Sequence, residues 1–115
     1  MSDDWWHERL SHYREVIRSM DHEILELIEK RMKACAEIGE IKIHLNKPVF
    51  DPEQEKMVLK DKAKTGAALG LDEGFVKDLM ILIMNYSKRL QSQRVTIAEK
   101  ENRYFAEKTG ELVTR

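Results

Sequence analysis

The chain is short of the residues that build many kinds of functional site. Its single cysteine, Cys35, excludes a disulfide framework within the chain and a metal site made of cysteines. His7, His12, His22 and His44 are scattered and lack the spacing of a zinc motif. Basic and acidic residues number 20 and 21, so the net charge is −1 and the sequence lacks the basic character typical of binding to nucleic acid or an anionic membrane.

Long hydrophobic runs are also missing. No segment approaches the roughly 20 apolar residues of a membrane-spanning helix. The acidic start, MSDDWWHERL, has no apolar region of the kind found in signal peptides, and we therefore expect a cytoplasmic protein. A length of 115 residues predicts one domain, residues 1–115, with a modest core that is small for a lone monomer.

There are only two prolines, Pro48 and Pro52, and the sequence before them predicts one long helix. Gly39 alone weakens it, by about 1 kcal/mol relative to alanine. At 1.5 Å per residue the helix is roughly 60 Å long, too long to cover a core built by one small chain, so we expect a partner helix of similar length. From about Asp4 to Leu45, apolar residues recur at the three- and four-residue steps of an amphipathic helix, namely Leu10, Tyr13, Ile17, Met20, Ile24, Leu27, Ile28, Cys35, Ile38, Ile41 and Leu45.

Two further helices are predicted after the prolines. Pro48 is expected to end the first helix, and Asp51 followed by Pro52 and Gln54 has the pattern of an N-cap with a capping box. The second helix should stop at the glycines of TGAALGLDEG, and Asp72 can cap a third helix. The third pattern weakens beyond Ser92 but continues toward Tyr104, before a polar end, EKTGELVTR, that we expect to fray. The fold class is therefore all-α, with helices in the order long, short, long.

Three cations on the first helix require an explanation: Arg14, Arg31 and Lys42. Arg31 and Lys42 are eleven residues apart and point within about 20° of each other, on the apolar side. Their stems could simply lie along the apolar surface with the charges reaching water. Alternatively they form a buried anion site, since an unpaired cation in a core is costly. Arg14 lies about 25 Å from Arg31 along the axis and could join that site only from an antiparallel second copy.

The other two helices carry carboxylates and neutral polar side chains that could complement these cations. Asp51 and Glu55 are four residues apart and can share a face of the second helix, although both also suit helix capping and the helix dipole. Ser87 and Gln91, likewise four apart, lie on the side of the third helix that Leu79 and Leu90 mark as inward. An ordinary polar flank is the simpler interpretation of this second pair.

Taken together, these residues resemble the AroQ class of chorismate mutases, the all-α type that forms an intertwined antiparallel homodimer. The resemblance covers roughly residues 8–93 and rests on three stretches in order: REVIRSMDHEILELIEKRMKACAEIGEIK, KPVFDPEQEK and GLDEGFVKDLMILIMNYSKRLQSQ. The spacing fits that family without gaps at seven positions: Arg14, Arg31, Lys42, Asp51, Glu55, Ser87 and Gln91.

The resemblance implies a role for each of these residues. Arg31 and a partner chain's Arg14 would bind the two carboxylates of chorismate, with Ser87 helping at one of them. Lys42 and Gln91 would hydrogen-bond the ether oxygen. Glu55, with Asp51 near it, would accept a hydrogen bond from the ring hydroxyl. The reaction implied is the unimolecular rearrangement of chorismate to prephenate in phenylalanine and tyrosine biosynthesis, which requires no cofactor and no metal. Gln54 departs from the family, many members of which have arginine there, and this predicts weaker binding of the dianion.

Other activities remain open at this point. An isochorismate-pyruvate lyase would keep the same cations, and a mutase acting on 4-amino-4-deoxychorismate could use the same carboxylate. A different class is a non-catalytic helical dimerisation module, in which Arg31, Lys42 and Gln91 would be exposed and dispensable. Residues 94–115 are expected to extend the third helix and end loosely, or else to form a docking segment for a partner enzyme or a lid. Without a second catalytic domain, we expect a monofunctional protein.

Overall fold

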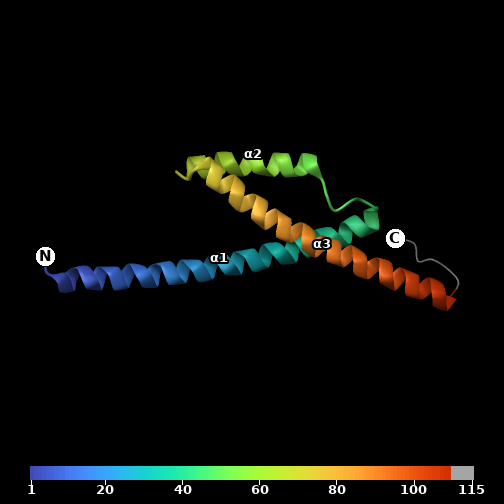
Figure 1. Cartoon of the computed structure of the whole chain (residues 1–115), viewed down its shortest axis with the longest axis horizontal. Coiled ribbons are helices and arrows are strands. Elements are labelled where there is room, and N and C mark those ends of the chain that lie inside the picture. Colours follow the sequence, from blue (N-terminus) through green and yellow to red (C-terminus); the bar gives the residue numbers. More distant parts are fainter. Residues whose placement is uncertain (110–115) are drawn as a thin grey trace. The chain divides into compact units, whose positions relative to one another are not determined.

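The computed structural model describes residues 1–109 and contains no strand within them (Figure 1). Its helices are α1 (Asp3–Leu45), α2 (Pro52–Ala68) and α3 (Glu73–Thr109), which confirms the all-α fold and the order long, short, long. Of the stretch expected to fray, residues 110–115 lie outside the described part. Among the described residues, no helix combines the length and the apolar character needed to cross a bilayer.

The chain divides into two units, Met1–Lys33 and the part that begins at Ala34, and each is described by itself. The first unit consists of most of α1 and contains no buried residue. Its apolar stripe is open: Leu10, Ile17 and Ile24 are 46%, 56% and 53% exposed. The second unit contains the last turns of α1 together with α2 and α3, and all the buried residues belong to it.

Helix α1 ends at Leu45, and the turn that follows begins at Asn46, before Pro48. Asn46 has a φ of +57°, and the backbone N–H of Lys47 donates to the carbonyl of Lys42 at 2.8 Å. These are the features of a Schellman motif, in which one left-handed residue lets the chain turn back and satisfies the last carbonyls of the helix. The helix ends at Leu45, as expected, and the left-handed Asn46, a conformation that asparagine tolerates, is a stop signal that precedes Pro48.

The caps of α2 and α3 are those predicted. The Asp51 Oδ1 atom accepts a hydrogen bond from the backbone N–H of Gln54 at 3.1 Å, with Pro52 at the first helical position. The Asp72 Oδ2 atom accepts from the backbone N–H of Phe75 at 2.9 Å. Each carboxylate satisfies one of the backbone donors that a helix start leaves without an intrahelical partner.

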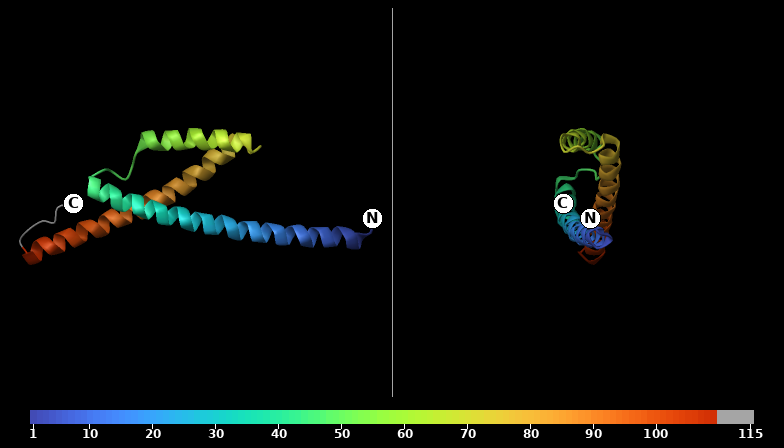
Figure 2. Two further views of the ribbon diagram at one scale, coloured as in Figure 1. Left: turned by 180° about the vertical axis from the view of Figure 1, so that it is seen from behind. Right: turned by 90° about the vertical axis from the view of Figure 1, so that its left-hand side faces the viewer.

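Helices α2 and α3 pack against each other, and the views agree on this (Figures 1 and 2). Ala63 and Gly66 are the buried residues of α2, and Val76 is buried on α3. A Cβ atom built on Gly66 would lie only 2.5 Å from Val76 Cγ2, so the two helices approach more closely than an alanine would permit. The short helix is thereby held against the first turns of α3.

The last turns of α1 cross the middle of α3 at Gly39. A Cβ atom on Gly39 would lie 3.2 Å from Gln91 Cγ and 3.4 Å from Gln91 Cα, closer than most packed side chains. Cys35 and Ile43 of α1 and Met84 of α3 are buried in this unit. Arg94 Nε on α3 donates a hydrogen bond to Glu40 Oε2 on α1 at 2.8 Å, next to the contact between Gly39 and Gln91. Gly39, expected only to weaken α1, is thus a place where α1 closely approaches Gln91.

Candidate active site

A lysine and a glutamine from different helices form the centre of the candidate site. Lys42, near the end of α1, donates from Nζ to Gln91 Oε1 on α3 at 3.0 Å. It also donates to the carbonyl of Val49, in the connection to α2, at 2.9 Å. Gln91 is buried, with only 6% of its surface exposed, and Lys42 is partly buried. The structure therefore brings together two of the residues that the sequence singled out, 49 positions apart.

The hydrogen bond from Lys42 decides what Gln91 can offer to a ligand. Because the amide oxygen accepts from the ammonium group, the amide nitrogen, with its two donors, lies on the other side of the amide. An ammonium group has three donors, and two of those of Lys42 are used by Gln91 and Val49. The pair can thus present an N–H from each residue to one further acceptor. That arrangement suits an oxygen atom on which negative charge develops.

A second polar pair joins α2 to α3. Lys88 Nζ lies 2.8 Å from Glu55 Oε1, and the two side chains are 29% and 26% exposed. The Lys88 ammonium is also 4.9 Å from the centroid of the Phe50 ring. Glu55 was predicted as a site residue, but Lys88 was missed. The available signal was its position three residues before Gln91, which places the two on adjoining turns of α3.

Ser87 is buried, with 4% of its surface exposed, and is already engaged within the chain. Its hydroxyl donates to the carbonyl of Ile83 at 3.0 Å and accepts from the thiol of Cys35 at 3.4 Å. Serine hydroxyls on helices commonly bond back to the carbonyl four residues earlier. A role at a substrate carboxylate would require this hydroxyl to rotate, so that part of the prediction stays a prediction.

The remaining residues that the sequence singled out belong to the start of α2 and to the first unit. Asp51 is exposed and caps α2, and Gln54 is exposed in the first turn of that helix. Arg14, exposed, and Arg31, partly buried, both belong to the first unit, Met1–Lys33. Their roles at a shared site stay predictions.

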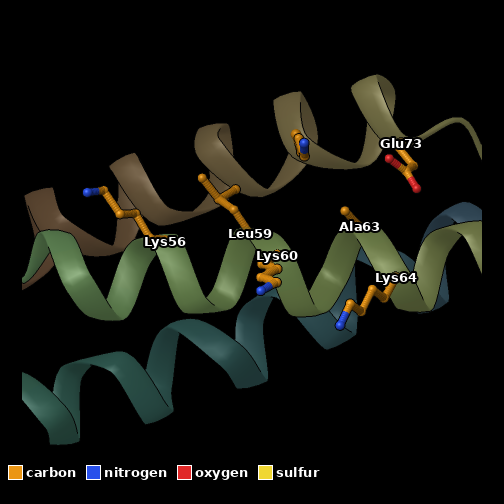
Figure 3. A pocket seen from close by; sticks show the side chains of 7 residues that line it. Lys56, Leu59, Lys60, Ala63, Lys64 and Glu73 are labelled. Carbon is orange, nitrogen blue, oxygen red and sulfur yellow. The ribbon is translucent and has the colours of Figure 1, made fainter.

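Two of the hollows in the second unit are lined in part by lysines. One, of about 350 Å³, is lined by Lys42, Asn46, Lys47 and Glu99 among others, so it adjoins the predicted lysine from the side of the α1–α2 connection. The other, of about 440 Å³, lies between α2 and α3 and contains none of the predicted site residues (Figure 3). Its rim carries mainly lysines, including Lys56, Lys60 and Lys64. In the described part of the chain, no three His, Cys, Asp or Glu side chains gather as metal ligands would.

Comparison with known proteins assigns the chain to a family. The family model for chorismate mutase type II matches residues 13–92. The chain is 29% identical over 96 residues to the chorismate mutase of Methanocaldococcus jannaschii, covering 84% of this chain and 97% of that protein. It is 33% identical over 78 residues to the T-protein of Enterobacter agglomerans, covering 68% of this chain and 21% of that protein.

A bifunctional chorismate mutase/prephenate dehydratase of Buchnera aphidicola is 32% identical over 81 residues, which is 70% of this chain and 21% of that protein. The chain thus spans about a fifth of the T-protein and of the bifunctional relative, but nearly all of the archaeal one. The matched residues include all seven positions on which the resemblance rested. The chain belongs to the type II chorismate mutase family.

Proposed function

We propose that this protein converts chorismate to prephenate, as a step toward phenylalanine and tyrosine. The observation that carries the proposal is the pairing of the Lys42 ammonium with the buried Gln91 amide. Membership of the type II chorismate mutase family supports it. A non-catalytic dimerisation module predicts that Gln91 is exposed, whereas only 6% of its surface is accessible.

The reaction is a [3,3] rearrangement within one molecule. The C–O bond of the enol-pyruvyl ether breaks while a C–C bond forms, and no proton, nucleophile or electron is exchanged with the protein. The protein must hold the compact conformer and stabilise the charge that grows on the ether oxygen. Lys42 and Gln91 would donate to that oxygen, and their effect is greater in the transition state, where the charge is larger.

The other residues would bind and orient the substrate. Arg31 and a partner's Arg14 would each form a bidentate pair with a carboxylate, a geometry to which the guanidinium group is suited. Glu55 would accept from the ring hydroxyl. Ordering the substrate in this way reduces the entropy that must be lost on reaching the transition state.

The proposed assembly is a homodimer in which each site takes residues from both chains. The open apolar stripe of the first unit supports it, since Leu10, Ile17 and Ile24 are about half exposed and Leu27 is 64% exposed. A contiguous apolar surface of this kind on a helix is typical of an interface. A second copy is the occupant that fits, because a helix of 43 residues needs a partner of comparable length.

The product identifies the activity. Purified protein incubated with chorismate should yield prephenate without a metal or cofactor being added. Under this proposal, incubation with isochorismate should not release pyruvate. Pyruvate without prephenate would overturn the proposal in favour of a lyase.

One variant tests the observation that carries the proposal. Lys42→Ala should lower kcat/KM for chorismate by about 10²–10³-fold, the usual effect of removing a donor from a site of developing charge. Lys47→Ala is the matched control, because that exposed lysine lies five residues along and its backbone N–H, which completes the α1 cap, is kept. Equal activity of the two variants would remove Lys42 from the mechanism.

Mixing two inactive variants tests the shared site. In a heterodimer of an Arg14→Ala chain with an Arg31→Ala chain, one site loses both arginines and the other keeps both. Random mixing should restore about a quarter of the wild-type sites, because half of the dimers are heterodimers with one intact site each. No recovery, with both variants still dimeric, would show that each site is built from one chain.

A further inference from the structure

Glu55 has a proposed role at the ring hydroxyl, but its ion-pair partner Lys88 has none. Lys88 extends from α3 and reaches the first turns of α2, where its ammonium lies 2.8 Å from Glu55 Oε1. The Phe50 ring lies on another side of the same ammonium, with its centroid 4.9 Å away. A cation held by both a carboxylate and an aromatic face has two independent attractions, which keep it in place beside Glu55.

Lys88 also stands close to the ether-oxygen donors along the chain. It lies three residues before Gln91, and residues at that spacing have neighbouring side chains on a helix surface. In chorismate the ring carbon that carries the hydroxyl adjoins the one that carries the ether oxygen. A ligand held by Gln91 and Lys42 through its ether oxygen can therefore reach the Glu55–Lys88 pair with the substituent on the next carbon.

We propose that Lys88 determines which substituent the site accepts there, favouring a neutral hydroxyl over an ammonium group. This inference rests on the proposed function of Glu55. An ionised carboxylate has about four lone-pair positions, so Glu55 can bind Lys88 and still accept a hydrogen bond from a hydroxyl. An ammonium group at the same place meets a carboxylate whose charge Lys88 already balances, and it meets Lys88 itself as a like charge.

A site without Lys88 would prefer an ammonium substituent to a hydroxyl. An unbalanced Glu55 carboxylate would attract a cationic substituent more strongly than a neutral one, since the charge-assisted bond is the stronger of the two. Lys88 is thus a positioning and specificity residue that acts through Glu55. Its expected effect is on the choice between chorismate and 4-amino-4-deoxychorismate, which differ only in this group.

The test compares two ligands in wild type and variants. KM for chorismate and the inhibition constant of 4-amino-4-deoxychorismate against chorismate are measured for wild type, Lys88→Met and Lys88→Arg. The ratio of inhibition constant to KM should fall on the order of tenfold or more in Lys88→Met, because two unit positive charges within about 5 Å repel strongly at an effective dielectric constant near 20. Lys88→Arg keeps the charge and should keep the ratio.

Lys56→Met is the matched control. Lys56 pairs with Glu53 at 3.7 Å on the same helix as Glu55, but the two side chains are 77% and 82% exposed. This variant should leave the ratio as in wild type. A fall of the same size in Lys56→Met would show a general effect of charge and overturn the proposal.

The remaining outcomes distinguish a failure of the Lys88 proposal from a failure of the proposed mutase function. If wild type makes prephenate and Lys88→Met has an unchanged ratio, Lys88 does not select the substituent, although the mutase assignment stands. If wild type makes no prephenate, the proposed function fails and this inference fails with it. Circular dichroism checks folding, and Lys88→Gln, which removes the charge but keeps a polar side chain, replaces Lys88→Met if that variant does not fold.

Discussion

The two units of the chain differ in whether their apolar residues are exposed or buried. In Met1–Lys33 no residue is buried, and the side chains at the helical period that should form a core are about half exposed. From Ala34 onward, Cys35, Ile43 and Met84 are buried at 6–8% exposure, and the polar Ser87 and Gln91 are buried at 4% and 6%. Both parts have the same amphipathic pattern, so the pattern alone does not decide burial. The second unit buries apolar residues among its own helices, whereas the apolar residues of the first unit stay exposed.

The largest expected effect comes from placing a charge on the open stripe of the first unit. Ile24→Glu should abolish the dimer and with it the mutase activity, because an unpaired carboxylate in an apolar interface is costly to bury. Light scattering after size exclusion measures the mass. His22→Glu is the control, since it introduces the same residue about 160° around the helix. A dimeric, active Ile24→Glu protein would show that the stripe is not the interface.

The next effect concerns the buried pair of the second unit. Gln91→Glu replaces an amide donor by a carboxyl group, which donates only when protonated and has an ordinary pKa of about 4.3. The variant should be active in acid and lose activity as pH rises, because the ionised group repels the charge growing on the ether oxygen. Wild type should be nearly flat from about pH 5.5 to 8.5, since the amide of Gln91 does not titrate. A flat profile in the variant would remove Gln91 from the ether oxygen.

A smaller effect is expected at the helix crossing. Gly39→Ala adds a methyl group 3.2 Å from Gln91 Cγ, so α3 must move by a few tenths of an ångström. We expect a loss of about 1–3 kcal/mol in the free energy of unfolding, as for other overpacked sites, and a reduced kcat because Gln91 is displaced. Denaturant unfolding measures the free energy of unfolding, and steady-state kinetics measure kcat. Ala36→Gly, on the same helix, is a control for helix propensity, and a fully stable, fully active Gly39→Ala protein would contradict the close-approach argument.

The smallest effect is expected at Gln54, which is exposed at the start of α2. Gln54→Arg should lower KM for chorismate by several-fold and change kcat little, because an added cation binds the dianion equally in the ground and transition states. Gln54→Lys adds the same charge without a guanidinium group, so it shows whether a change in KM comes from charge alone. If KM is the same in both variants as in wild type, the side chain does not face the substrate.

Much of the fold could be predicted, because the signals are local. The helical period, the caps at Asp51 and Asp72, and the breaks in the chain depend on residues within a few positions of one another. The end of α1 was placed correctly near Leu45 but attributed to Pro48, since the left-handed conformation of Asn46 is a backbone property that a single sequence signals only weakly. The pairing of Lys42 with Gln91 could be anticipated only through the family resemblance.

By itself, then, the sequence determined the helices, their caps and the set of polar residues available to a site. Only the tertiary structure decided which of these residues meet. The close approach at Gly39 depends on α3 crossing there, and the partnership of Lys88 with Glu55 joins residues of two helices. Neither has a local signature, because a contact between distant segments depends on how helices pack and not on the neighbours of either residue along the chain.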